Sequence, residues 1–311
     1  MNVYPFKFKP IFKERIWGGQ KLKEFFNKDI SAGTKIGESW ELADLPKDKS
    51  VIANGPLAGK TLAEALEKYP KEITGSDNYK GPFPLLIKIL DAEDMLSVQV
   101  HPDAQTCKKM GKGDPKTECW YIIAADAGSY IYKGLKGGTT KEQFARAIKD
   151  GACAELLNKV SVKVGQCHFL PAGTVHVIGA GLLIAEIQTP SDTTYRVFDW
   201  NRLQDNGSGR QLHIAEALES IHFNQNPDEL TVATSGRLVD SDVFKVDKSE
   251  EALLNPCQMK ILIIIAGSGR ITSPASEIFF SKGQTILIPA AFNGSIKSDN
   301  KCSYLSVTIE D

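Results

Sequence analysis

The sequence has little net charge and no long hydrophobic run. Its 311 residues carry 37 Lys and Arg against 38 Asp and Glu, a formal net charge of −1. This balance argues against non-specific binding of nucleic acid or anionic membrane, although a small anionic ligand needs only a few basic groups. No apolar stretch approaches the roughly 18–20 residues that span a bilayer, and residues 1–10 lack the apolar core of a signal peptide. We therefore expect a cytoplasmic protein with neither a nucleic-acid nor a membrane partner.

Paired cysteines are also missing from the sequence. The six cysteines are scattered, at positions 107, 119, 153, 167, 257 and 302, and form no Cys-X-X-Cys pair. This usage is typical of free thiols in a reducing compartment.

Helical patterns are few, and most of the chain favours β-structure. Apolar, β-branched runs predict strands within residues 81–90, 94–102, 117–126, 258–267, 283–291 and 302–310. Helices are predicted at 61–69, 139–151 and 212–221, the second opened by a capping box of Thr140 and Gln143. The polar segment 223–230 indicates a linker. We expect a mainly β protein with a large domain carrying helical insertions, residues 1–228, and a small all-β domain, residues 229–311.

One hairpin sequence occurs twice. Residues 165–176, GQCHFLPAGTVH, align with residues 283–294, GQTILIPAAFNG. Both have Gly, five strand-like residues, Pro and then small residues, a pattern typical of a sharp entry, a short strand and a tight turn. The first copy places His176 after the turn, where the second has Gly294. The pattern indicates an internal duplication in which only the first copy kept a chemical site.

Partners for His176 are found on two earlier strands. In residues 96–101 the alternation places Leu96, Val98 and Val100 on one face and Ser97, Gln99 and His101 on the other. A polar face of this kind does not enter a core unless something satisfies it. Glu118 opens the next strand and shares a face with Trp120 and Ile122. Two imidazoles, a carboxylate and an amide oxygen suit Zn²⁺, and would also accept Fe²⁺, Mn²⁺ or Co²⁺.

Each of these residues also has an ordinary structural interpretation. A single His before Pro, such as His101, is more often a strand-end residue, and a carboxylate at a strand start, such as Glu118, is usually solvated. Only the ordered conjunction of the three segments favours a metal site. His168 lies inside the hairpin strand without a matching partner and is assigned no role. His213 and His222 are interpreted as surface or helix-end residues.

The ordered set resembles the cupin superfamily, whose second motif is a G-X5-P-X-G-X2-H hairpin. The chain also contains six motifs in order: RIWGG (15–19), GESWE (37–41), PLLIKILDAEDMLSVQVHPD (84–103), KTECWY (116–121), LPAGTVHVIGAG (170–181) and EIQTPSDTTYRVFDWNR (186–202). With these motifs it is similar, within the cupins, to type I mannose-6-phosphate isomerase (phosphomannose isomerase), in its short bacterial form. It implies two cupin-like jelly-roll β-barrel domains, the C-terminal one without metal ligands.

The resemblance also implies roles for individual residues. It makes His101, Glu118 and His176 ligands of one Zn²⁺ per chain, with Gln99 as a fourth. Catalytic roles are implied for Arg196 and Lys116, and substrate binding, linked to phosphate in longer members, for Ser97 and Lys88. A zinc-bound hydroxide and Glu41 are rivals to Lys116 as the base.

The implied reaction interconverts mannose 6-phosphate and fructose 6-phosphate, by proton transfer through an enediolate. Two other functions stay open at this point. One is an Fe²⁺- and O₂-dependent cupin oxygenase, and the other a sugar-binding regulatory cupin without catalysis. The sequence also leaves open whether the chain is a monomer or a homodimer.

Overall fold

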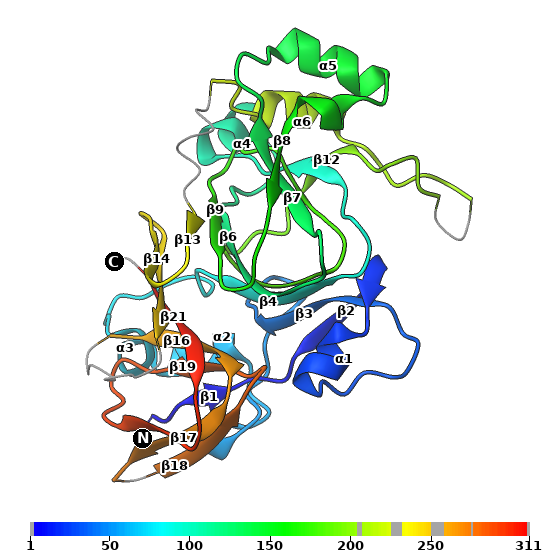
Figure 1. Ribbon diagram of the computed structural model, residues 1–311. Helices are drawn as coiled ribbons and strands as arrows, with labels where there is room; N and C mark the ends of the chain where they lie inside the picture. Colours follow the sequence, from blue (N-terminus) through cyan, green and yellow to red (C-terminus); the bar gives the residue numbers. More distant parts are fainter. Residues whose placement is uncertain (1–2, 204–206, 225–231, 250–257, 275, 310–311) are drawn as a thin grey trace.

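The computed structural model describes residues 3–203, 207–224, 232–249, 258–274 and 276–309, and β-structure dominates it (Figure 1). Within these ranges no helix has the length and apolar character that a membrane span requires. The five cysteines of the described part are buried free thiols, as expected; Cys257 lies outside it.

Two antiparallel sheets build the N-terminal barrel, and both surround one core. In the described chain one sheet has seven strands, in the order β13-β9-β6-β11-β4-β3-β2, and the other has five, in the order β12-β5-β10-β7-β8. The first comprises β2 (Ile11–Gly19), β3 (Ile36–Leu42), β4 (Leu86–Ala92), β6 (Glu118–Ala125), β9 (Cys167–Leu170), β11 (Leu182–Gln188) and β13 (Val232–Ala233). The second comprises β5 (Val98–Val100), β7 (Tyr130–Leu135), β8 (Leu157–Ser161), β10 (His176–Ile178) and β12 (Tyr195–Phe198). Trp120 and Ile184 from the first sheet pack with Ile131 and Ile178 from the second.

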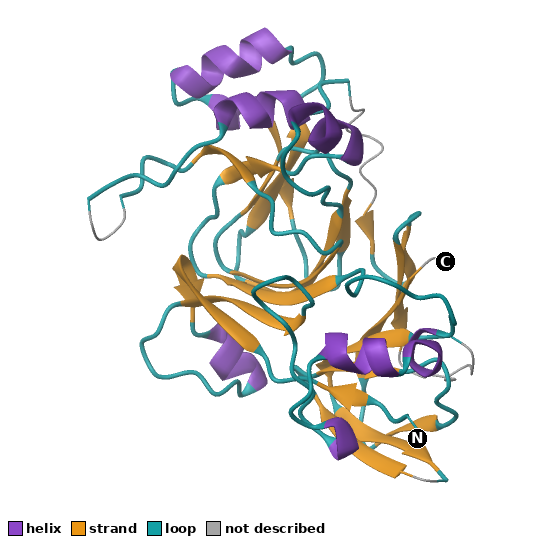
Figure 2. Cartoon of the chain, turned by 180° about the vertical axis from the view of Figure 1, so that it is seen from behind, coloured by secondary structure: helices purple, strands orange, loops and turns teal. Residues whose placement is uncertain are grey.

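Three helices cover the outer face of the five-stranded sheet (Figure 2). They are α4 (Ala104–Met110), α5 (Lys141–Lys149) and α6 (Ile214–Ser220), with the 3₁₀ turn η2 (Cys153–Leu156) after α5. The predicted capping box is present, because the Thr140 side chain accepts from the Gln143 backbone and the Gln143 side chain accepts from the Thr140 N–H. Phe144 then packs against Val98 and Val100 of β5. α5 and α6 correspond to the helices predicted at 139–151 and 212–221, and α2 (Leu62–Lys68) to the one predicted at 61–69, whereas α4 was not predicted.

The C-terminal barrel also consists of two sheets in the described residues. Its six-stranded sheet has the order β1-β19-β16-β21-β15-β14, and its three-stranded sheet the order β18-β17-β20. The strands are β1 (Phe6–Lys7), β14 (Gly236–Asp240), β15 (Phe244–Ser249), β16 (Lys260–Ala266), β17 (Ser268–Ser273), β18 (Ser276–Ser281), β19 (Thr285–Ile288), β20 (Ser295–Ser298) and β21 (Ser303–Ile309). The shorter elements η1 (Gly55–Leu57), α1 (Lys21–Phe26), α2 (Leu62–Lys68) and α3 (Pro70–Thr74) complete the fold. Both halves are cupin-like, as the resemblance implied.

A second core joins the two barrels. It includes Ile87 and Tyr121 from the seven-stranded sheet and Phe244, Ile261 and Leu287 from the six-stranded sheet, all buried. Two strands also cross between the halves: β1 pairs with β19, and β13 pairs with β9. The predicted linker, 223–230, falls mostly outside the described residues, so the boundary near residue 228 stays a prediction.

The repeated hairpin has the same local structure in both copies. Gly165 and Gly283 both have positive φ, 91° and 82°. Each is followed after one residue by a four-residue strand, β9 or β19, and then by a turn in which the residue three after Pro donates its N–H to the Pro carbonyl, at 3.2 and 2.9 Å. The sequence repeat is therefore a structural repeat. In the first copy the chain continues into β10, which begins at His176.

The predicted faces of residues 96–101 are correct for β5 and wrong at Leu96. Val98 and Val100 pack under the helices, whereas Leu96 packs with Trp17 and Trp120 and lines the pocket described below. The alternation fails there because β5 begins only at Val98, so Leu96 lies in the preceding loop.

Candidate metal centre and substrate pocket

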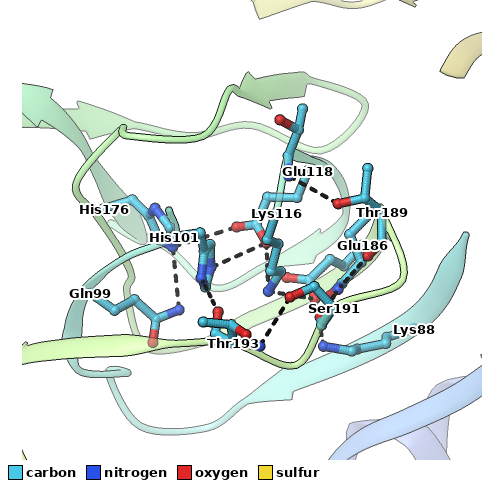
Figure 3. Close-up of polar contacts among 12 residues, drawn as sticks. Lys88, Gln99, His101, Lys116, Glu118, His176, Glu186, Thr189, Ser191 and Thr193 are labelled. Carbon is cyan, nitrogen blue, oxygen red and sulfur yellow. Dashed lines mark hydrogen bonds and ion pairs between the residues drawn. The ribbon is translucent and has the colours of Figure 1, made fainter. Parts of the chain in front are cut away.

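Three strands bring the predicted ligands together in the N-terminal barrel (Figure 3). His101 follows β5, Glu118 opens β6 and His176 opens β10. The Nε2 atoms of His101 and His176 lie 3.4 Å from Oε2 and Oε1 of Glu118, respectively. Nε2 of His101 and Oε1 of Glu118 are buried without a hydrogen-bond partner. Unsatisfied donor atoms of this kind, all within 4.8 Å of one another, fit a bound metal ion.

Backbone carbonyl groups orient both imidazoles. Nδ1 of His101 lies 2.8 Å from the carbonyl oxygen of Thr193, and Nδ1 of His176 lies 2.8 Å from that of Thr174. A carbonyl only accepts, so Nδ1 carries the proton and the Nε2 lone pair is left for a metal. Burial lowers the pKa of both rings, for His101 to well below its usual value. The imidazoles are therefore neutral, the form that binds metal.

Glu118 is held as an anion. Burial alone would raise its pKa, but the charge of Lys116 and its hydrogen bond to Glu118 lower it overall. Nζ of Lys116 lies 2.8 Å from Oε2 of Glu118. The metal centre thus contains one fixed negative charge.

Gln99 lies beside His176. The two residues are paired across β5 and β10, and the side-chain nitrogen of Gln99 lies 3.3 Å from Nε2 of His176. Its oxygen faces the hydroxyl of Ser97 at 3.3 Å. Turning the amide over exchanges these two atoms and points the oxygen to the metal site.

A second carboxylate extends the charged network away from the metal. Glu186 of β11 accepts from Lys88 at 3.0 Å and from the indole of Trp120 at 3.1 Å, and lies 4.0 Å from Lys116. Burial alone would lower the pKa of Lys88, but Glu186 and Glu38 raise it overall. Lys88 is therefore a permanent ammonium, and its nitrogen lies 5.3 Å above the Trp40 ring.

A pocket of about 440 Å³ opens beside this network. Four of the side chains that were predicted as substrate-binding or catalytic line it, namely Lys88, Ser97, Lys116 and Arg196, and so does Gln99. Arg196 donates from Nε to Ser97 at 3.3 Å and from a terminal nitrogen to the carbonyl of Gln211 at 2.9 Å.

Glu41, the predicted rival base, does not line this pocket. Its carboxylate accepts from Lys28 at 2.7 Å, on the opposite face of β3 from Glu38. Glu38 takes that place in the pocket, where it accepts from Arg15 at 2.8 Å and from Trp40 at 2.6 Å. The motif at 37–41 contains both carboxylates, and the alternation of the strand places them on opposite faces of β3. The sequence does not indicate which of the two faces borders the pocket.

Several further pocket residues have no role in the sequence prediction. They are Glu14, Arg15, Glu38, Glu186, Asp192, Arg210 and His213. Glu186 had a detectable signal, because a carboxylate inside the apolar run 182–188 must have a buried partner. His213 was interpreted as a helix-end residue. It does precede α6, but it also lines the pocket and accepts from the Arg196 N–H at 3.3 Å.

Comparisons with known proteins agree with this geometry. A family model described as "Phosphomannose isomerase type I, catalytic domain" matches residues 5–146. The chain is 39% identical to the mannose-6-phosphate isomerase ManA of Bacillus subtilis, covering 93% of this chain and 94% of the relative. It is 37% identical to a mannose-6-phosphate isomerase of Streptococcus mutans, covering 89% of each.

The comparison with solved structures leads to the same family as the comparison with sequence relatives. A crystal structure of the mannose 6-phosphate isomerase from Bacillus subtilis superposes with a TM-score of 0.86 at 32% identity, covering 98% of this chain and 99% of that one. A structure from Archaeoglobus fulgidus, at 18% identity and a TM-score of 0.79, shares the fold.

Proposed function

Because the chain belongs to the type I phosphomannose isomerase family, and interconverts mannose 6-phosphate and fructose 6-phosphate, we propose that this reaction takes place in the pocket beside His101, Glu118 and His176. Moving the carbonyl from C1 to C2 requires a proton to leave C2 and another to reach C1. The pocket must therefore hold the open-chain sugar, stabilise the oxygens that gain charge, and supply a base.

We propose Zn²⁺ as the metal, held by His101, Glu118 and His176 with the amide oxygen of Gln99 as fourth ligand. The donor set of neutral imidazoles and one carboxylate suits this ion. When bound, the ion supplies Lewis-acid stabilisation to the substrate oxygens.

Lys116 is the proposed base. Its nitrogen lies between the carboxylates of Glu118 and Glu186, at 2.8 and 4.0 Å, and it lines the pocket. In its neutral amine form it can accept the C2 proton, and as the resulting ammonium it can return that proton to C1 on the same face of the sugar. Lys88, the other lysine of the pocket, is held charged by Glu186 and Glu38 and is unsuited to that role.

Arg196, Ser97 and Lys88 are the proposed substrate contacts. The Arg196 guanidinium is permanently charged and presents a planar set of donors, so it can hold the open-chain sugar and stabilise a developing oxyanion. Ser97 positions it through the 3.3 Å hydrogen bond. The charge of Lys88 is already neutralised by Glu186, so its position suits a substrate hydroxyl near the metal.

The observation that carries this proposal is the buried triad with unsatisfied donor atoms, which lies directly behind Gln99 and Lys116 in the lining of a charged pocket. The test is a coupled fructose 6-phosphate assay on the purified protein, before and after chelation, with metal analysis of the same samples. We expect zinc near one ion per chain, activity lost on chelation and activity restored by Zn²⁺. Iron-dependent oxygen uptake without isomerase activity would contradict it. A cytoplasmic location and a domain boundary near residue 228 belong to the same proposal.

A further inference from the structure

One end of the pocket is crowded with guanidinium groups. Arg15 of β2, Arg196 of β12 and Arg210 of the segment before α6 all line it, and Arg202 lies just behind. That segment is tied to β12, since the His213 N–H donates to the Arg196 carbonyl at 2.8 Å. Three separate parts of the chain therefore direct cations to one place.

The nearby carboxylates leave two of these arginines without a close counter-ion. Glu38 forms an ion pair with Arg15. Glu14 and Asp192 also line the pocket, but neither forms an ion pair with the three arginines within the described residues. Asp199 is bound by Arg202 at 2.5 Å and reaches Arg210 only at 3.5 Å. Arg196 makes no ion pair within the described part of the chain, so both guanidinium groups can still accept an anionic partner.

The arginines also repel one another. Burial and the neighbouring charge of Arg210 lower the pKa of Arg196, and burial together with Arg202 and Arg15 lowers the pKa of Arg210. The repulsion disfavours the charged form of both guanidinium groups. A dianion bound between them would offset that repulsion and favour the charged form.

Arg15 and Arg210 make no hydrogen bond or ion pair with the metal triad within the described residues, and β5 separates the strand of Arg196 from that of His176. In the five-stranded sheet Arg196 pairs with Gln99, and Gln99 pairs with His176. Two strand spacings of about 4.8 Å each place the Arg196 backbone roughly 10 Å from that of His176. The carbonyl end and the phosphate end of a hexose 6-phosphate are likewise at opposite ends of the molecule.

We propose that Arg210, with Arg15 beside it, binds the phosphate group of the substrate and makes the enzyme specific for the phosphorylated sugar. This inference rests on the proposed location of the reaction in this pocket. Arg210 is the better of the two to test, because its removal leaves Asp199 paired with Arg202. Arg202 has a structural role instead, since it also donates to the Met95 carbonyl at 2.6 Å.

The test compares Arg210→Gln with the wild type and with Arg237→Gln, a control in β14 that removes an exposed arginine paired with Asp247. We expect Arg210→Gln to raise KM for mannose 6-phosphate about 10- to 100-fold, the loss of one charged hydrogen-bonding group, while kcat changes less. Turnover of unphosphorylated mannose at high concentration should stay unchanged, and the thermal midpoint should match that of the control.

Calorimetry with inorganic phosphate separates this inference from the proposed function. We expect Arg210→Gln to weaken phosphate binding by a similar factor and Arg237→Gln to leave it unchanged. If the wild type binds phosphate but does not isomerise the sugar, the proposed function fails and the anion site stands. A KM and a phosphate affinity within twofold of wild type in Arg210→Gln would overturn the inference.

Discussion

At Glu118, a lysine and two histidines converge on one carboxylate. Lys116 approaches one oxygen at 2.8 Å, and His101 and His176 lie 3.4 Å from the two oxygens. The side chain is completely buried. An anion in that position is stable only while positive charge surrounds it, so a metal ion and Lys116 both contribute to holding the site together.

Replacing His176 with Ala should abolish activity and leave the fold intact. The substitution removes one of the three proposed ligands at the start of a short strand, and the surrounding β-strands keep their own pairing. Metal analysis, the isomerase assay and circular dichroism test this together. His222→Ala is the control, since His222 is half-exposed and contacts Asp103. Retention of both metal and activity in His176→Ala would exclude it as a ligand.

Replacing Lys116 with Gln should lower kcat about 10²- to 10⁴-fold, the usual contribution of a positioned acid–base group, while metal content is retained. Exchange of the substrate C2 proton with deuterated water should fall in parallel, because the same group carries that proton. Lys112→Gln, at an exposed lysine paired with Glu216, is the control. Unchanged exchange in Lys116→Gln would assign the base elsewhere.

His168, to which the sequence assigned no role, is expected to affect acid stability. It is fully buried, and neither ring nitrogen has a hydrogen-bond partner within the described chain. Burial, reinforced by the charge of Lys133, lowers its pKa to about 4. The unfolded chain binds this proton near pH 6.5, so between pH 6.5 and 4 the unfolded state carries more protons and stability falls as pH falls.

His168→Gln removes that contribution. We expect the wild type to lose on the order of 3 kcal/mol more unfolding free energy than the variant between pH 7 and pH 4. Urea titrations at several pH values measure both curves. Parallel curves would show that His168 does not titrate in this range.

At the scale of elements, the first hairpin corner depends on Gly173. Its φ is +84°, and a Cβ added there would lie 2.5 Å from the His222 ring. Its N–H donates to the His101 carbonyl at 2.8 Å, so the corner also positions the strand end that carries a ligand. The second copy has Ala291 at the equivalent place, which is not in the left-handed region.

Gly173→Ala should therefore lower both stability and metal affinity. The left-handed backbone alone costs about 1–2 kcal/mol, and the contact with His222 adds to it. Gly128→Ala is a matched control, with φ of +82° and nothing within 4 Å of the added atom. We expect thermal melts to show a larger loss for Gly173→Ala, with weaker zinc binding only in that variant. Equal losses in the two variants would mean that the contact with His222 relaxes without cost.

Local sequence patterns predicted where most strands and helices lie. They predicted less well which face of each strand borders the pocket. The capping box at Thr140, the strands and the hairpin repeat all depend on neighbours in sequence, so they could be recognised from the chain. Whether Glu38 or Glu41 faces the pocket depends on which side of β3 a distant strand covers. The pattern does not contain that information.

At the scale of the whole molecule, the two barrels share a core. Ile87 and Tyr121 of one sheet contact the apolar face that carries Phe244 and Leu287 of the other. His101, Glu118 and His176 could be singled out from the sequence because each stands in a recognisable local motif. Arg210 could not be singled out in this way, because only the tertiary structure brings Arg15, Arg196 and Arg210 together in the lining of one pocket.

A chain ended after residue 224 should not fold cooperatively, although it contains all the predicted ligands. Truncation exposes the apolar face of the seven-stranded sheet and removes the partner of β1. We expect aggregation or a broad, non-cooperative transition in calorimetry, against a sharp one for the full chain. A soluble fragment with a sharp transition would show that the N-terminal barrel is an independent folding unit.

The pairing of β1 with β19 has a consequence for synthesis on the ribosome. Phe6 and Lys7 are made long before Leu287 and Ile286, with which they pair. Contacts so distant in sequence form slowly, and β1 has no β19 to pair with until residues 285–288 have emerged. The edge of the six-stranded sheet is thus closed by a strand made much earlier than its neighbour, and a nascent chain that stalls before residue 285 keeps β1 unpaired.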